Sequence, residues 1–267
     1  MTLHYTKEEQ DEYEKTLKEV HFQSLFGFLN AHNGFRRGCM HLAIGTTGGG
    51  KSTLTRSIIR DVICNNGDNV LLGLWLSEET ISDYKQQLSI GLPVMDRLLK
   101  TDAQSELEFT DGFTEMRFFE WLEFTKPDIV IFDNITTSKF YMDKRPDAQA
   151  AFATKLKNIT KKLNFALVLI AHTDSSASDS QKGILNINHI RGAKTICNLV
   201  EFAYILQRFE IGQGFFPTLR VVKSRSQELL HSLYLLKYEN KLRSYVSDSP
   251  LEFKKFKEAY GQRNRLD

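Results

Sequence analysis

The sequence Gly45-Thr46-Thr47-Gly48-Gly49-Gly50-Lys51-Ser52 carries the strongest structural signal in this chain. It follows an apolar run at 40–44 and precedes a helical pattern that extends from about 52 to 64. Glycines permit conformations that turn backbone N–H groups toward an anion, and the following helix adds its positive N-terminal end. Strand, glycine-rich loop and helix in this order match the phosphate-binding pattern GxxxxGK[ST]. A turn that binds nothing is the alternative, and the flanking strand and helix disfavour it.

The loop pattern assigns an expected role to each polar residue. Lys51 is expected to reach the β- and γ-phosphates of ATP, and the Ser52 hydroxyl is expected to bind Mg²⁺. The expected nucleotide-binding residues are Gly45, Thr46, Thr47, Gly48, Gly49, Gly50, Lys51, Ser52 and Thr53.

Apolar runs alternate with helical patterns along most of the chain. Beyond 40–44, strands are expected at 70–76, 129–132, 165–171 and 201–207, and shorter ones at 218–223, 232–238 and 242–246. Continuous apolar strands separated by helices indicate a mainly parallel sheet with helices on both faces, and the last strands suggest antiparallel hairpins at one edge. We therefore expect one α/β domain over 35–267, preceded by an N-terminal helical arm over 1–34.

Composition excludes several classes of protein. The chain has 267 residues, of which 41% are hydrophobic and 25% charged, so it is neither disordered nor collagen-like. Its acidic N-terminus is unlike a secretory signal, and its apolar runs are too short to span a bilayer. The three cysteines form no CxxC pair and indicate reduced thiols in a cytoplasmic protein. No membrane partner is expected. The net charge of +2 neither requires nor excludes nucleic acid.

Two acidic positions at strand ends are candidates for the chemistry. Asp133 follows the apolar run 129–132 about 80 residues after the loop, as in a Walker B strand, and is expected to hold Mg²⁺. The next residue, Asn134, cannot act as a base. Glu78 lies at the end of another expected strand, beside the loop, and is our candidate general base. The alternative is that Glu78 and Glu79 only place negative charge in the first turn of a helix.

A histidine ends the strand expected at 165–171. His172 is placed to contact both the γ-phosphate and the loop that follows it, and thereby to report the nucleotide state. The alternative is that it only caps the strand end.

These motifs, taken in order, resemble the RecA-like ATPase domain of DnaB-type ring-shaped replicative helicases. The likeness covers roughly 35–247 and extends to the helicase half of phage primase–helicases. Its more specific parts are Ser77-Glu78-Glu79-Thr80, His172, Arg191-Gly192 and the pair Lys223 and Arg225.

The resemblance implies further roles and partners. Arg225 corresponds to an arginine finger that enters the site of a neighbouring subunit, and Lys223 is its companion. The segment 173–195 corresponds to the loop that holds single-stranded DNA, with Arg191, Gly192 and Lys194 as its expected contacts. A homo-hexamer, ATP and Mg²⁺ as cofactors, and a primase or other replication proteins as partners are implied as well. Without the resemblance, Lys223 and Arg225 read as a basic edge strand and 173–195 as an ordinary loop.

Two departures from the family keep other functions open. The family usually has a small residue where this chain has Lys194, and it usually carries a larger N-terminal domain than the 35 residues found here. The main expectation is a DNA-unwinding motor in a bacterium or a phage-infected cell. The alternatives are a RecA-like or KaiC-like ATPase that does not unwind DNA, such as an accessory factor or regulatory switch, and a nucleotide-binding scaffold without turnover.

Overall fold

The fold is described from a computed structural model. It describes residues 6–8, 21–22, 24, 26–30, 34–66, 70–77, 98–100, 111–138, 141, 145–173, 184–190, 194–211, 214–225, 230–252, 254 and 256.

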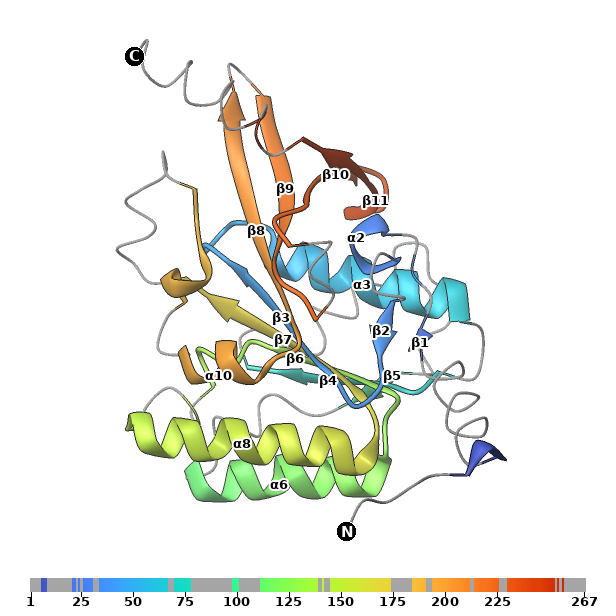
Figure 1. The fold of residues 1–267 in the computed structure, drawn as a ribbon, viewed down its shortest axis with the longest axis vertical. Helices are drawn as coiled ribbons and strands as arrows, with labels where there is room; N and C mark the ends of the chain where they lie inside the picture. The colour runs from blue at the N-terminus through green and yellow to red at the C-terminus, as the bar shows by residue number, and fades with distance from the viewer. Residues whose placement is uncertain are drawn as a thin grey trace.

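A nine-stranded sheet forms the centre of the described part of the chain (Figure 1). Its strands, in spatial order, are β11 (Ser244–Leu251), β10 (Leu233–Glu239), β9 (Gly214–Lys223), β8 (Phe202–Ile211), β3 (Met40–Gly45), β7 (Ala166–His172), β6 (Ile129–Asp133), β4 (Leu72–Leu76) and β5 (Leu98–Lys100). The strands from β8 to β5 pair in parallel, and β9, β10 and β11 pair antiparallel. The expected mainly parallel sheet with antiparallel strands at one edge is therefore confirmed.

Helices cover both faces of this sheet (Figure 1). Helix α3 (Lys51–Asn66) lies on one face, and α6 (Asp111–Thr125) and α8 (Pro146–Leu163) lie on the other. The shorter helices are α2 (Gly27–Asn30), η2 (Ile187–His189) and α10 (Lys194–Leu199), and a separate two-stranded sheet joins β1 (His21–Phe22) to β2 (Phe35–Arg36). No helix in the described ranges is long and apolar enough to cross a membrane.

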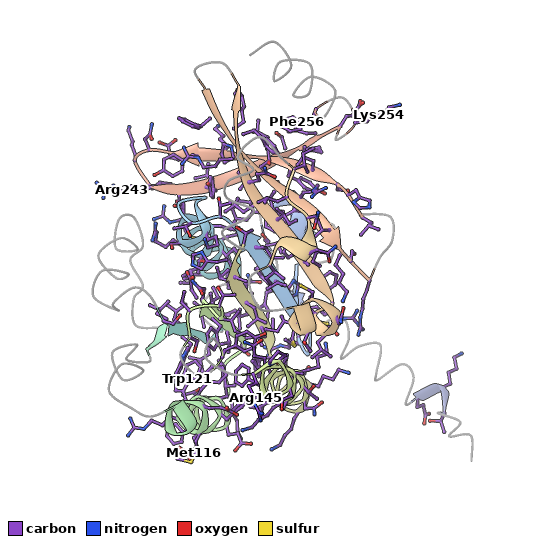
Figure 2. All side chains as sticks on the ribbon, turned by 90° about the vertical axis from the view of Figure 1, so that its left-hand side faces the viewer. Met116, Trp121, Arg145, Arg243, Lys254 and Phe256 are labelled. Carbon is purple, nitrogen blue, oxygen red and sulfur yellow. The ribbon has the colours of Figure 1, made fainter. Side chains whose placement is uncertain are left out.

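The parallel strands are buried on both sides, which explains their continuous apolar sequence. In β3, Ala43 packs in the cluster beneath α3, whereas Leu42 and Ile44 pack in the cluster beneath α6 and α8. Helix α6 likewise has an inner and an outer side. Figure 2 shows Trp121 on the side of α6 that faces the sheet and Met116, which is 46% exposed, on the outer side. A Cβ at Gly73 would lie 2.6 Å from Trp121 Cη2, so the glycine admits the indole to the sheet surface.

Part of the predicted N-terminal arm packs on the sheet. Phe26, Phe28 and Leu29 are almost fully buried in the cluster beneath α3. The backbone N–H groups of Gly27 and Phe28 donate to the two carboxylate oxygens of Asp248 at 2.6 and 2.9 Å. Residues 9–20 of the predicted arm lie outside the described ranges.

Candidate functional site

The glycine-rich loop connects β3 to α3 at the carboxyl end of the parallel strands. Gly45 ends β3 and pairs in register with His172 of β7 and Leu206 of β8. The loop then turns on Gly48 and Gly50, whose φ angles are +72° and +95°. The N–H of Gly49 donates to the carbonyl of Thr46 at 3.0 Å, which closes the turn before α3 begins at Lys51. The sequence pattern and the local geometry therefore agree at each glycine that needs a positive φ.

Two positions of the loop also require glycine because a Cβ there would clash with a neighbouring group. A Cβ at Gly50 would lie 2.7 Å from the phenol oxygen of Tyr245, and one at Gly49 would lie 2.9 Å from the carbonyl oxygen of Thr46. At Gly48, by contrast, a Cβ would meet nothing within 4 Å. The loop is thus tightly enclosed on the side of β11 and open at Gly48.

Lys51 directs its charge into the loop. The residue is 7% exposed, and its ammonium donates to the carbonyl of Thr46 at 2.8 Å. A loop that presents N–H groups, a helix N-terminus and an enclosed ammonium has the chemistry that binds a polyphosphate. The glycine positions leave the backbone accessible at the place where phosphate oxygens must approach.

Asp133 lies at the carboxyl end of β6, and β7 separates β6 from β3. Asp133 is 6% exposed, and two strand spacings place it roughly 10 Å across the sheet from the loop. The hydroxyl of Ser52 and the carboxylate of Asp133 are oxygen ligands, which Mg²⁺ prefers, and Mg²⁺ commonly keeps several of its waters between such groups. The donor set present therefore fits a hydrated Mg²⁺ ion beside the phosphates.

The end of β4 is tied to the end of β6. Ser77 donates its backbone N–H to the carbonyl of Asp133 at 2.8 Å and its hydroxyl to the carbonyl of Asn134 at 2.6 Å. The peptide bond between Asp133 and Asn134 is cis. Glu78, the predicted base, directly follows Ser77 but lies outside the described residues, so its role stays a prediction.

His172 contacts the loop. Its Nδ1 lies 3.3 Å from the hydroxyl of Thr47, and its backbone N–H donates to the hydroxyl of Thr136 at 3.0 Å. The next residue, Thr173, forms a β-bridge with Ile190 and donates its N–H to the carbonyl of Gly45 at 3.3 Å. The predicted sensor position thus joins the loop to the segment 184–190.

The predicted DNA contacts lie largely outside the described ranges. Arg191 and Gly192 are not described, and of Lys194 the structure gives only its place as the first residue of α10. Their role in DNA binding stays a prediction.

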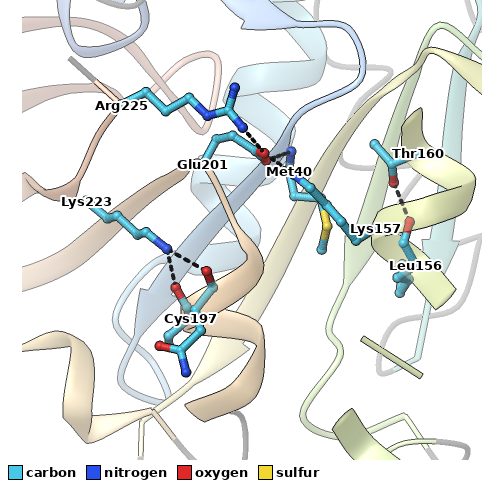
Figure 3. Close-up of polar contacts among 9 residues, drawn as sticks. Met40, Leu156, Lys157, Thr160, Cys197, Glu201, Lys223 and Arg225 are labelled. Carbon is cyan, nitrogen blue, oxygen red and sulfur yellow. Dashed lines mark hydrogen bonds and ion pairs between the residues drawn. The ribbon is translucent and has the colours of Figure 1, made fainter. Parts of the chain in front are cut away.

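Lys223 and Arg225 lie at the opposite end of the sheet from the loop. Lys223 pairs with Ala203, three residues before the level of Leu206 and Gly45, and two strand spacings separate β9 from β3. The two ends are therefore roughly 15 Å apart. Figure 3 shows the contacts: the Lys223 ammonium donates to the carbonyls of Cys197 and Asn198 at 2.7 and 3.0 Å, and Arg225 donates to Glu201 at 2.9 Å.

Burial changes the ionisation of two groups in this region. It lowers the pKa of Lys223 and raises the pKa of the Cys197 thiol to about 11. Neither Lys223 nor Arg225 contacts the loop of its own chain in this arrangement.

Tyr245 of β11 is a site residue that the sequence did not reveal. Its phenol lies against Gly50, and its backbone N–H donates to the hydroxyl of Ser57 in α3 at 2.8 Å. Burial raises the pKa of Tyr245, and the charge of Arg208 opposes that shift. The ring of Tyr238, which is 45% exposed, meets that of Tyr245 edge-on at 5.8 Å between centroids. Nothing in the local sequence marks a tyrosine almost 200 residues after the loop as its neighbour.

Comparisons with known proteins identify the fold. No protein-family model matches the sequence, and no curated protein matches it in sequence. Among solved structures, the chain is similar to a KaiC-like protein from the hyperthermophilic archaeon Pyrococcus horikoshii, with a TM-score of 0.64 and 13% sequence identity. The match covers 87% of this chain and 100% of the other. The chain therefore has the RecA-like α/β fold, which is the fold class that the sequence predicted.

Proposed function

We propose that this protein is a Mg²⁺-dependent ATPase that works as an assembly of identical subunits, binds single-stranded DNA and translocates along or unwinds DNA in replication. The loop at 45–52 carries the proposal: positive-φ glycines, the enclosed Lys51 ammonium and the start of α3 converge on one point of a RecA-like sheet. The order of motifs that resembles DnaB-type helicases supports the finer part of the proposal.

In this proposal Lys51 exchanges the carbonyl of Thr46 for phosphate oxygens when ATP binds. Bound Mg²⁺ draws negative charge from the phosphates and so makes the γ-phosphorus easier to attack. Ser52 and Asp133 hold the ion, and Glu78 accepts the proton of the attacking water. Arg225 of a neighbouring copy stabilises the charge that develops on the transferred phosphoryl group.

In this proposal, aromatic and cationic groups of β8, β9 and β10 are suited to the nucleotide base. Tyr238 presents a partly exposed ring, and the Arg208 guanidinium lies 4.7 Å from the ring centroid of Phe215. Planar groups of this kind stack on a purine ring with little selectivity between adenine and guanine.

A second function has its own support. The structural likeness, at 13% sequence identity, is to a KaiC-like protein. An ATPase that does not unwind DNA, such as a regulatory switch, has the same loop, carboxylates and subunit-bridging arginine. The two functions differ in what DNA does to turnover.

The test measures ATP binding and turnover with and without single-stranded DNA. We expect Lys51→Ala to lose ATP binding and turnover, and Glu78→Gln to keep binding but to lose turnover by at least about 100-fold. Lys162→Ala removes an exposed lysine of α8 and is the control. Its ATP binding and turnover should equal those of the wild type. Unchanged turnover in Lys51→Ala would contradict the proposed site.

DNA then separates the two functions. Strong stimulation by single-stranded DNA, lost in Arg191→Ala, together with displacement of a strand from 5′- or 3′-tailed duplexes, supports the motor. Turnover that is indifferent to DNA supports the KaiC-like function instead.

A further inference from the structure

A buried carboxylate holds the predicted arginine finger within its own chain. The side chain of Glu201, directly before β8, is only 3% exposed. It accepts from the backbone N–H of Met40 at 2.9 Å and from Arg225 Nη2 at 2.9 Å, and it also pairs with Lys157 of α8 (Figure 3). Three donors, from β3, from α8 and from the segment after β9, therefore converge on one carboxylate at the end of the sheet opposite the loop.

Arg225 keeps capacity for a second anion while it is held. Its side chain is 58% exposed, and the contact with Glu201 uses Nη2, which carries two of the five guanidinium N–H donors. Arg225 also lies two residues beyond the end of β9, where the ladder no longer fixes the backbone. Glu201 thus orders the guanidinium and still leaves a face of it open to solvent.

Glu201 does not depend on Arg225 for its own neutralisation. Lys157, 11% exposed, and the N–H of Met40 contact the same carboxylate from the interior. A buried carboxylate that loses its only cation is strongly destabilising, whereas one that keeps a second cation is not. Sharing Arg225 with a phosphate therefore leaves no buried charge unpaired.

Lys223 fixes the end of β9, the strand that precedes Arg225. Its ammonium binds the carbonyls of Cys197 and Asn198 in the last turn of α10, where a cation is favourable. This contact holds the end of β9 against α10, two residues before Arg225. Lys223 is accordingly an anchor for the backbone, and Glu201 acts on the side chain itself.

We propose that Glu201 is a positioning residue for Arg225, which it holds in the orientation that meets the phosphates of ATP bound by a second copy of this chain. The inference rests on the proposed function, in which Arg225 acts between copies. An arginine that is ordered before the subunits meet loses less side-chain entropy when it binds phosphate, and a misplaced one slows the chemical step.

The test is a double-mutant cycle on the assembled, full-length protein. We expect Glu201→Gln to lower kcat for ATP about tenfold while KM stays within about twofold, because nucleotide binding uses the other end of the sheet. In an Arg225→Ala background, where kcat is already low, Glu201→Gln should cause no further loss. Glu123→Gln, which removes an exposed carboxylate of α6 paired with Lys162, is the matched control and should keep wild-type kcat.

Each outcome decides a different point. Equal losses from Glu201→Gln in both backgrounds mean a merely structural role and overturn the inference. A low kcat in Arg225→Ala with a wild-type kcat in Glu201→Gln overturns the inference but leaves the proposed function standing. A wild-type kcat in Arg225→Ala overturns the proposed role of that arginine and the inference with it.

A second variant covers the case in which Glu201→Gln fails to fold. Glu201→Gln combined with Lys157→Met removes both charges of the buried pair, so no unpaired ammonium remains in the interior. Its folding is checked by circular dichroism and thermal denaturation. The inference expects the same tenfold loss of kcat in this double variant, and a wild-type kcat would overturn it.

Discussion

Gly50 shows how one residue type can be fixed by two independent constraints. Its φ of +95° lies where residues with a Cβ are strained, and the phenol oxygen of Tyr245 occupies the place of a Cβ. We expect Gly50→Ala to lower the free energy of unfolding by about 1–3 kcal/mol through backbone strain, with a further loss from the contact with Tyr245. Chemical denaturation measures the stability, and a fluorescent ATP analogue measures the accompanying loss of binding.

Tyr245→Phe separates the two constraints. It removes the phenol oxygen that lies 2.7 Å from a Cβ at residue 50 and leaves the ring carbon at 3.7 Å. Gly50→Ala should therefore lower the free energy of unfolding by less in this background than in the wild type. Gly48→Ala is the control, because it has a φ of +72° but no neighbour within 4 Å. Additive effects of Gly50→Ala and Tyr245→Phe would show that the phenol contact has no energetic weight.

At the residue scale, sequence reasoning found the groups whose spacing is local. Lys51 and Ser52 follow the glycines directly, and the positive φ angles of Gly48 and Gly50 agree with the pattern. It did not find Tyr245 or Glu201, because their importance arises from contacts with residues far away in the chain. A buried carboxylate of this kind is recognised only when its cations are brought to it by folding.

At the scale of elements, Asp248 in β11 stabilises the start of α2. Its carboxylate accepts the N–H groups of Gly27 and Phe28, and burial raises its pKa although both hydrogen bonds oppose that shift. We expect Asp248→Ala to lower the free energy of unfolding by about 1–3 kcal/mol, because two partly buried N–H groups lose their acceptors.

Urea denaturation tests this expectation, with Asp147→Ala as the control. Asp147 is also an aspartate near a helix start, but its side chain is 72% exposed, so its removal should change stability by only about 0.5 kcal/mol. Equal effects of the two substitutions would contradict a stabilising contact between β11 and the segment 26–30.

Strands could be predicted from the sequence where both faces of the sheet are buried, because such strands have continuous apolar sequences. Strands β3, β6 and β7 begin and end within one residue of the expected runs. The hairpin of β8 and β9 is longer than expected, because its outer halves extend past Leu206 and carry exposed residues such as Phe215. The strand β5 and the helix α6 were not expected, since their mixed sequence has neither period.

At the scale of the whole molecule, buried thiol and phenol groups make the free energy of unfolding depend on pH in the alkaline range. Burial raises the pKa of Cys197 from 9.0 to about 11, and it also raises the pKa of Tyr204. A thiol that keeps its proton longer when folded contributes stability that is complete below pH 9 and is lost as pH rises toward 11. The contribution of Cys197 over this window is about 2–3 kcal/mol.

The measurement is the free energy of unfolding from pH 8 to pH 11.5 for the wild type and Cys197→Ala. The wild type should lose about 2–3 kcal/mol more than the variant, since all other groups titrate in both proteins. Cys64→Ala, which removes an exposed thiol of α3, controls for the loss of a thiol as such. Parallel pH curves for the wild type and Cys197→Ala would contradict the expected linkage.

The separation of the glycine-rich loop from Arg225 also constrains how copies of this chain can associate. The two features lie at opposite ends of the parallel strands, so the contact proposed between Arg225 of one copy and the loop of the next is readily made head-to-tail, with different faces of the two copies meeting. An open head-to-tail stack keeps one unused loop at one end and one unused guanidinium at the other. Repeating that contact gives either a closed circle, in which no terminal copy remains, or a helical filament whose two ends are chemically different.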